Sequence, residues 1–160
     1  MAYYKLEVKA TLNALNIAFP DFKFRVSQQA LSEQRRNHPK IKVWITSGPL
    51  DFSDPQLPVF VDLDIEHQRF HFAPNMVLFL QSVIKVIKFG TKNQWFGRWE
   101  YNQWRDEQQY TSAFDIDIQL GRCNQPYSFR NVRKLKGTTN YMQAADETIA
   151  WTRLGAVAAP

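Results

Sequence analysis

Carboxylates recur at every second position in two segments of the chain. The first segment carries Asp62, Asp64 and Glu66, and the second carries Asp115 and Asp117. Side chains two residues apart share one face of a β-strand. Carboxylates from two neighbouring strands could therefore meet and hold Mg²⁺ or Mn²⁺, which activates water or a phosphate for phosphoryl transfer. The alternative is that these acids form the solvent face of an antiparallel sheet.

The other residue types that could do chemistry form no recognisable catalytic motif. His67 and His71 lie four residues apart, but no third ligand stands at a spacing typical of zinc sites. Cys123 is the only cysteine, and no histidine accompanies it in a cysteine-hydrolase motif. The sequence also has no glycine-rich phosphate loop, dinucleotide fingerprint or serine-hydrolase elbow. We therefore expect a protein without catalytic residues or a cofactor.

Basic residues gather in three parts of the sequence, and aromatic residues accompany one of them. These parts are the segment 35–42, the segment 85–99 with its tryptophans, and the segment 121–137, which contains no acid. The candidate binding residues in these segments are Arg35, Arg36, Lys92, Trp95, Arg98, Trp99, Arg122, Arg130, Arg133, Lys134 and Lys136.

These residue types suit two kinds of partner. Lysine and arginine neutralise phosphates, and exposed rings stack on unpaired bases with about 1–3 kcal/mol for each base. Large rings also supply much of the binding energy of protein–protein interfaces. Nucleic-acid binding, protein binding and a purely structural role therefore all remain open.

Periodicity predicts three helices and four or more strands. Helices are expected over 3–19, ending before Pro20, over 74–89, capped by Gly90, and over 140–154, with Asn140 as a possible cap. Alternating or apolar runs predict strands at 22–26, 41–46, 59–65 and 114–120, with a hairpin partner for the last near 127–129, whereas 91–110 is expected to be irregular.

This element order predicts an α+β fold. We expect a mixed or mainly antiparallel sheet of about four to six strands, with two or three helices packed mainly on one face. The length of 160 residues fits a single domain over 1–160, whose tail from about 140 is a docking helix or partly flexible.

Charge and composition indicate which partners and which cellular compartment suit this chain. The net charge of +5 permits binding to nucleic acid or to an acidic partner without requiring either. A single cysteine fits a reducing compartment. Neither the first twelve residues nor the apolar run 76–80 is typical of a signal peptide or a membrane span. We expect a cytoplasmic protein that does not bind membranes.

The N-terminal third of the chain resembles a group of small domains. Its Phe-Pro at 19–20 precedes a strand containing Lys23 and Phe24, and a strand containing Trp44 runs into Gly48-Pro49. This pattern is similar to small domains within large polyvalent proteins of phages and conjugative elements. Those domains usually have a glycine-rich link between the two strands, where this chain has the polar segment 28–39. The resemblance implies a protein that acts inside a bacterial host, on host defence or on DNA.

Three functional hypotheses follow. The leading one is a non-enzymatic accessory protein of a phage or mobile element that binds and inhibits a host-defence component. The first alternative is a nucleic-acid-binding module that uses the basic and aromatic clusters. The second is a metal-dependent phosphotransfer enzyme that uses Asp62 and Asp64 with Asp115 and Asp117. The oligomeric state is left open.

Overall fold

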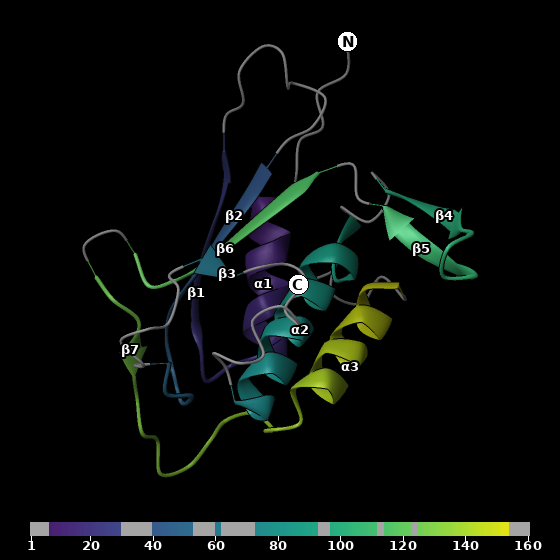
Figure 1. The fold of residues 1–160 in the computed structure, drawn as a ribbon. Helices are drawn as coiled ribbons and strands as arrows, with labels where there is room; N and C mark the ends of the chain where they lie inside the picture. Colours follow the sequence, from purple (N-terminus) through teal and green to yellow (C-terminus); the bar gives the residue numbers. More distant parts are fainter. Residues whose placement is uncertain are drawn as a thin grey trace.

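The computed structural model describes residues 7–29, 40–52, 60–61, 73–92, 97–111, 114–122 and 125–153. In this part of the chain, three helices accompany a five-stranded sheet and a separate two-stranded hairpin (Figure 1). The expected α+β fold is therefore confirmed, with both parallel and antiparallel pairs in the main sheet.

Two parallel strands form the centre of the main sheet. They are β2 (Lys40–Gly48) and β6 (Asp115–Leu120), paired in register from Lys40 opposite Asp115 to Ile45 opposite Leu120. Buried apolar residues alternate with half-buried ones in both strands, and the half-buried ones are polar except for Trp44, which is why one face of the sheet is apolar. The buried residues are Ile41, Val43 and Ile45 of β2 and Ile116, Ile118 and Leu120 of β6.

Three further strands complete the sheet. β1 (Lys23–Gln29) pairs antiparallel with β2, and β3 (Phe60–Val61) pairs antiparallel with β6, so that the strand order is β1-β2-β6-β3. β7 (Ser128–Phe129) lies parallel to the last residues of β2, beyond the end of β6.

The three helices are α1 (Val8–Ala18), α2 (Pro74–Phe89) and α3 (Tyr141–Arg153). Pro74 begins α2, and the N–H of Gly90 donates to the carbonyl of Val86 at its end, 2.7 Å away. The Asn140 side chain accepts from the N–H of Gln143, which confirms it as a cap of α3. The predicted helices are thus confirmed in position, with α1 shorter than expected within the described residues.

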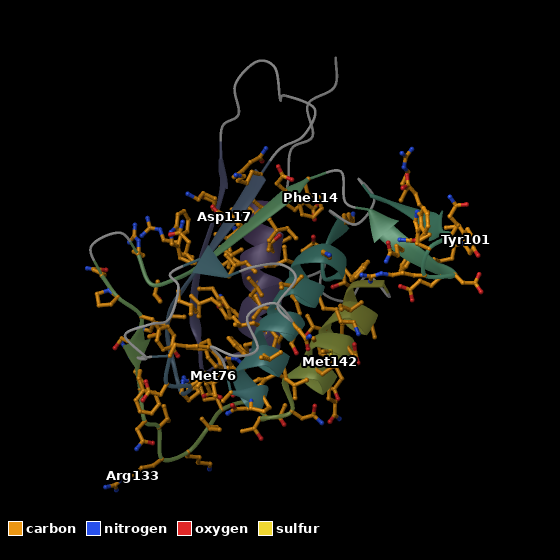
Figure 2. The ribbon with its side chains drawn as sticks, in the orientation of Figure 1. Met76, Tyr101, Phe114, Asp117, Arg133 and Met142 are labelled. Atoms are coloured by element: carbon orange, nitrogen blue, oxygen red, sulfur yellow. The ribbon has the colours of Figure 1, made fainter. Side chains whose placement is uncertain are left out.

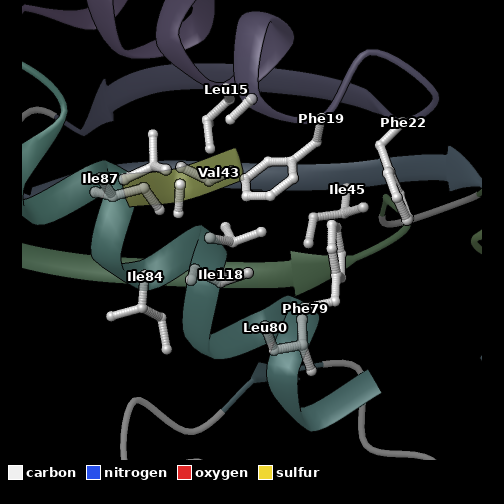
Figure 3. Close-up of a cluster of buried hydrophobic side chains, with 14 of the residues drawn as sticks. Leu15, Phe19, Phe22, Val43, Ile45, Phe79, Leu80, Ile84, Ile87 and Ile118 are labelled. Carbon is white, nitrogen blue, oxygen red and sulfur yellow. The ribbon is translucent and has the colours of Figure 1, made fainter. Parts of the chain in front are cut away.

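The core lies between the apolar face of the sheet and the helices (Figure 3). Phe79 of α2 is fully buried there, stacked on Phe22 with ring centroids 4.0 Å apart and packed edge-on against Phe19 and Tyr141. A Cβ at Gly48 would lie 2.1 Å from the Phe22 ring, so only glycine fits at the end of β2. These rings join α1, β1, α2 and α3 into one core.

Two expectations about strands were wrong. Residues 98–111 form an antiparallel hairpin of β4 (Arg98–Asn102) and β5 (Glu107–Thr111) rather than an irregular segment. The turn is favoured because the Asn102 side chain accepts from the N–H groups of Trp104 and Arg105, at 2.9 and 3.2 Å. β7 is not a hairpin partner of β6, because the loop between them returns the chain to its original direction beside β2.

Other expectations lie outside the described residues. They concern most of the predicted strand at 59–65, together with His67, His71 and Cys123. In the part of the chain that is described, no helix is long and apolar enough to cross a membrane.

We predict that Phe79→Ala lowers the free energy of unfolding by about 3–5 kcal/mol, since it removes the ring on which the other aromatic residues pack. Leu78→Ala, one position away but 50% exposed, is the matched control and should cost far less. Chemical denaturation measures both. Equal losses for the two variants would contradict the packing described.

Candidate functional site

The structure divides the candidate residues between two separate surfaces. One is the β4–β5 hairpin, and the other lies where β1, β2 and β7 meet, on the opposite side of the molecule in Figure 1. Arg35, Arg36 and Trp95, and also Asp62 and Asp64, fall outside the described residues. The sequence had grouped basic and aromatic residues together, but most of the described basic candidates are not on the aromatic hairpin.

Four cations line two adjoining hollows beside the end of β2. We call this surface the basic cleft, and its cations are Lys23, Arg25, Arg122 and Arg130. The hollows have volumes of about 560 and 260 Å³, and Lys23 and Arg122 line both. No carboxylate is among the described residues that line either hollow. Among the described residues that line the cleft, the positive charge is therefore not balanced by a carboxylate.

Backbone hydrogen bonds position these cations. Lys23 opens β1 opposite Ser47, where the register shifts. Gly121, with φ of 81°, donates its N–H to Ile45 across 2.8 Å and begins the loop that carries Arg122. The N–H groups of Arg122 and Gln125 donate to each other's carbonyls at 2.7 and 2.9 Å.

Two more contacts anchor this part of the sheet. The N–H of Arg130 donates to the carbonyl of Gly48 across 2.8 Å, which holds the chain after β7 against β2. The Tyr127 hydroxyl donates to the carbonyl of Leu50 across 2.7 Å, and its ring packs edge-on against Phe52. Burial of the Tyr127 hydroxyl raises its pKa, so it stays a neutral donor over the physiological range.

Ser47 lies at the smaller hollow and has an unusual environment. The residue is 3% exposed, and its Oγ has no hydrogen-bond partner in the described part of the chain. A buried polar group without a partner costs about 1–3 kcal/mol. Most buried polar groups in proteins are hydrogen-bonded, so this hydroxyl is available to bind a polar atom that enters the hollow.

The remaining basic candidates of the 121–137 segment lie apart from the hollows. Arg133, Lys134 and Lys136 are exposed on the segment between β7 and α3, and Arg133 points away from the body of the molecule at the bottom of Figure 2. That segment is tethered because the Asp21 carboxylate accepts from the N–H groups of Lys136 and Gly137, each at 2.8 Å. Of the basic candidates predicted in the 121–137 segment, the structure thus brings only Arg122 and Arg130 together, at the smaller hollow.

Lys23 and Arg25 were missed by the sequence analysis. Their alternation with Phe24 and Val26 in the sequence predicts a polar face of a strand that carries both, and this signal was available. Nothing in the sequence indicated that Lys23 and Arg25 lie near Arg122, because their nearness depends on which strands pair.

The hairpin presents three large exposed rings. Trp99 is 61% exposed, Tyr101 58% and Trp104, in the turn, 91%. Trp99 stacks on Phe89 of α2 with ring centroids 6.2 Å apart and an interplanar angle of 11°, which joins the hairpin to the body of the molecule. The Tyr101 hydroxyl donates to the Asp106 carboxylate, which raises the pKa of Tyr101.

The charges of the hairpin do not favour a polyanion. Arg98 Nε lies 2.5 Å from a Glu100 carboxylate oxygen, so its charge is compensated. Residues 98–111 carry two arginines against three acids. Lys92 is exposed at the end of α2, outside the hairpin. The sequence candidates Arg98 and Trp99 therefore belong to an aromatic surface without excess positive charge.

The acids of β6 face lysines of β2. On the face of the sheet away from the helices, Asp117 lies 3.8 Å from the Lys42 amine, and Asp115 is opposite Lys40 in the register. In the described residues no three His, Cys, Asp or Glu side chains form a group that could hold a metal ion. We expected the acids and the lysines in separate regions of the molecule. In the structure, the lysines of β2 lie opposite the acids of β6.

The comparisons with known proteins identify no relative. No protein-family model, curated protein or solved structure matches this chain. The two surfaces are therefore interpreted from their own geometry.

We predict that Tyr127→Phe lowers the free energy of unfolding by about 0.5–1.5 kcal/mol, because the carbonyl of Leu50 loses its hydroxyl donor. Tyr101→Phe, which removes an exposed hydroxyl from the hairpin, should be close to neutral. Thermal unfolding of both variants checks this. A Tyr127→Phe variant as stable as the wild type would contradict the anchoring role of this hydroxyl.

Proposed function

We propose that this chain is a non-enzymatic protein-binding module and that the β4–β5 hairpin is its recognition element. The observation that carries the proposal is the exposure of Trp104, at 91%, beside the exposed rings of Trp99 and Tyr101. Large rings that a folded chain leaves in water are typical of binding sites, because their burial against a partner releases much of the binding energy.

The hairpin suits a protein partner better than a nucleic acid. A phosphate backbone would meet two arginines, one of them paired with Glu100, and three acids. A protein surface with an apolar pocket can instead accept the indole ring of Trp104, while its polar rim contacts Glu100 and Arg105. Arg and Glu side chains at such a rim favour specificity more than affinity.

The setting we propose is the one that the resemblance of the N-terminal third implies. In that setting the chain is an accessory protein of a phage or mobile element in the bacterial cytoplasm. The partner is a host-defence protein, which the hairpin would bind and inhibit.

The test uses three versions of the chain as bait in a bacterial lysate, with and without nuclease treatment. A partner recovered by the wild type should be lost with Trp104→Ala and retained with Trp151→Ala, whose ring is 56% exposed on α3. Calorimetry with the purified partner should then show at least about a thirtyfold weaker affinity for Trp104→Ala, which corresponds to about 2 kcal/mol.

Two outcomes would contradict this proposal. One is a partner that binds Trp104→Ala as tightly as the wild type. The other is a partner whose recovery depends on intact nucleic acid.

The basic cleft favours a second candidate function, nucleic-acid binding. Its four cations have no carboxylate beside them among the described lining residues. Binding through such a surface should weaken steeply as salt rises, because phosphate contacts release counterions.

Fluorescence anisotropy with labelled DNA and RNA over a salt series tests this second candidate. Arg25→Gln with Arg122→Gln should lower the affinity and flatten the salt slope. Unchanged binding in that double variant, or no binding by the wild type at low salt, would exclude the cleft as a nucleic-acid site.

A further inference from the structure

We propose that the smaller hollow of the basic cleft is a binding site for a phosphate monoester group. We call it the Ser47 pocket, and the residues that carry the argument are Lys23, Ser47, Arg122, Ser128 and Arg130. This inference depends on neither function proposed above, since a phosphate could be bound here whether or not the hairpin binds a protein.

The charge of the pocket matches a dianion. Lys23, Arg122 and Arg130 converge on a hollow that no carboxylate lines in the described residues. A phosphate monoester carries a charge of about −1.5 to −2 near neutral pH, whereas a phosphodiester carries only one negative charge. Arginine also presents a planar fork of N–H donors that matches two phosphate oxygens at once.

The hydroxyl groups supply a second and independent reason. Ser47 is buried at the pocket and its Oγ has no partner in the described part of the chain. Thr46, its neighbour, already donates to the carbonyl of Lys23 across 3.2 Å. A phosphate oxygen is an acceptor that would give the Ser47 hydroxyl the hydrogen bond it lacks, and Ser128 adds another hydroxyl at the rim.

The size and the framework of the pocket are also suitable. Its volume of about 260 Å³ is several times the roughly 30 Å³ that one water occupies in the liquid. A group as small as a phosphate therefore fits in the pocket. The hydrogen bonds of Gly121 to Ile45 and of Arg130 to Gly48 hold both arginine-bearing segments against β2. A site whose backbone is already held in place loses less entropy on binding than one that must be assembled.

Calorimetric titration of the full chain with inorganic phosphate tests the proposal, with chloride at equal ionic strength as the blank. We expect saturable binding by the wild type and a loss of about tenfold or more in affinity for Arg122→Gln. Arg133→Gln removes an exposed cation of the same segment outside the pocket, so it should bind phosphate like the wild type.

Ser47→Ala gives a sharper readout that a purely structural role would not produce. It removes a buried hydroxyl that has no partner in the described structure, so the thermal stability without phosphate should be unchanged or higher. Its phosphate affinity should nevertheless fall about tenfold. An unchanged phosphate affinity in this variant would overturn the role assigned to Ser47.

The source of the phosphate is distinguished by competition. Phosphoserine, a 5′-phosphorylated oligonucleotide and its unphosphorylated form are each added to the phosphate-bound protein. We expect a monoester to displace the phosphate at a lower concentration than the unphosphorylated strand does, and the monoester that acts at the lowest concentration identifies the source.

Three results would overturn the phosphate site. They are no saturable binding by the wild type, an equal loss for Arg122→Gln and Arg133→Gln, and displacement by the unphosphorylated strand as effective as by a monoester. If phosphate binds while oligonucleotides of either form do not, nucleic-acid binding by the cleft is excluded and the phosphate site is still supported.

Discussion

The parallel pairing of β2 with β6 is the constraint on which the basic cleft depends. Since both strands run in the same direction, β6 ends beside Ile45 and leaves the last residues of β2 without a partner from β6. The loop after Gly121 then leads into β7, which continues along β2 at Ser47 and Gly48. Arg122 and Arg130, eight positions apart in the sequence, therefore line the same hollow as Ser47. An antiparallel pairing of the same strands would separate these groups.

The same pairing explains why the acids of β6 are a weak indication of metal chemistry. It places Asp115 and Asp117 opposite Lys40 and Lys42, so that charges of opposite sign pair across the face of the sheet away from the helices. Cross-strand pairs of this kind contribute modestly to stability. In the described part of the chain, the cleft collects cations with no carboxylate among its lining residues, and the aromatic surface lies on the hairpin across the molecule (Figure 2).

Local patterns predicted much of the fold, because they depend on neighbours in the sequence. The stripe of apolar residues in α2, its start at Pro74 and its end at Gly90 are local features, as is the alternation in β6. The strand partners are not local. Nothing near Ser128 indicates that it pairs with Ser47, which is why β7 was assigned to the wrong neighbour. The β4–β5 hairpin was missed because β5 is mostly polar, and a turn held by the Asn102 side chain gives only a weak pattern.

The candidate site could be predicted from the sequence only in part. The acid-free segment 121–137 pointed to Arg122 and Arg130, but also to Arg133, Lys134 and Lys136, which lie outside the hollows. Charge alone cannot separate these residues, because their positions depend on the loop that Tyr127 anchors to Leu50. The sequence could not predict a binding role for Ser47, since that role rests on a buried hydroxyl that has no hydrogen-bond partner in the described part of the chain.

We propose that this chain has two independent binding surfaces, one basic and one aromatic. Backbone amide chemical shifts, followed by NMR during a phosphate titration, test it most directly. We predict saturable shifts at Lys23, Ser47, Arg122 and Arg130, with no change at Trp99, Tyr101 and Trp104. Shifts spread over all exposed lysines and arginines, or shifts that include the hairpin, would contradict it.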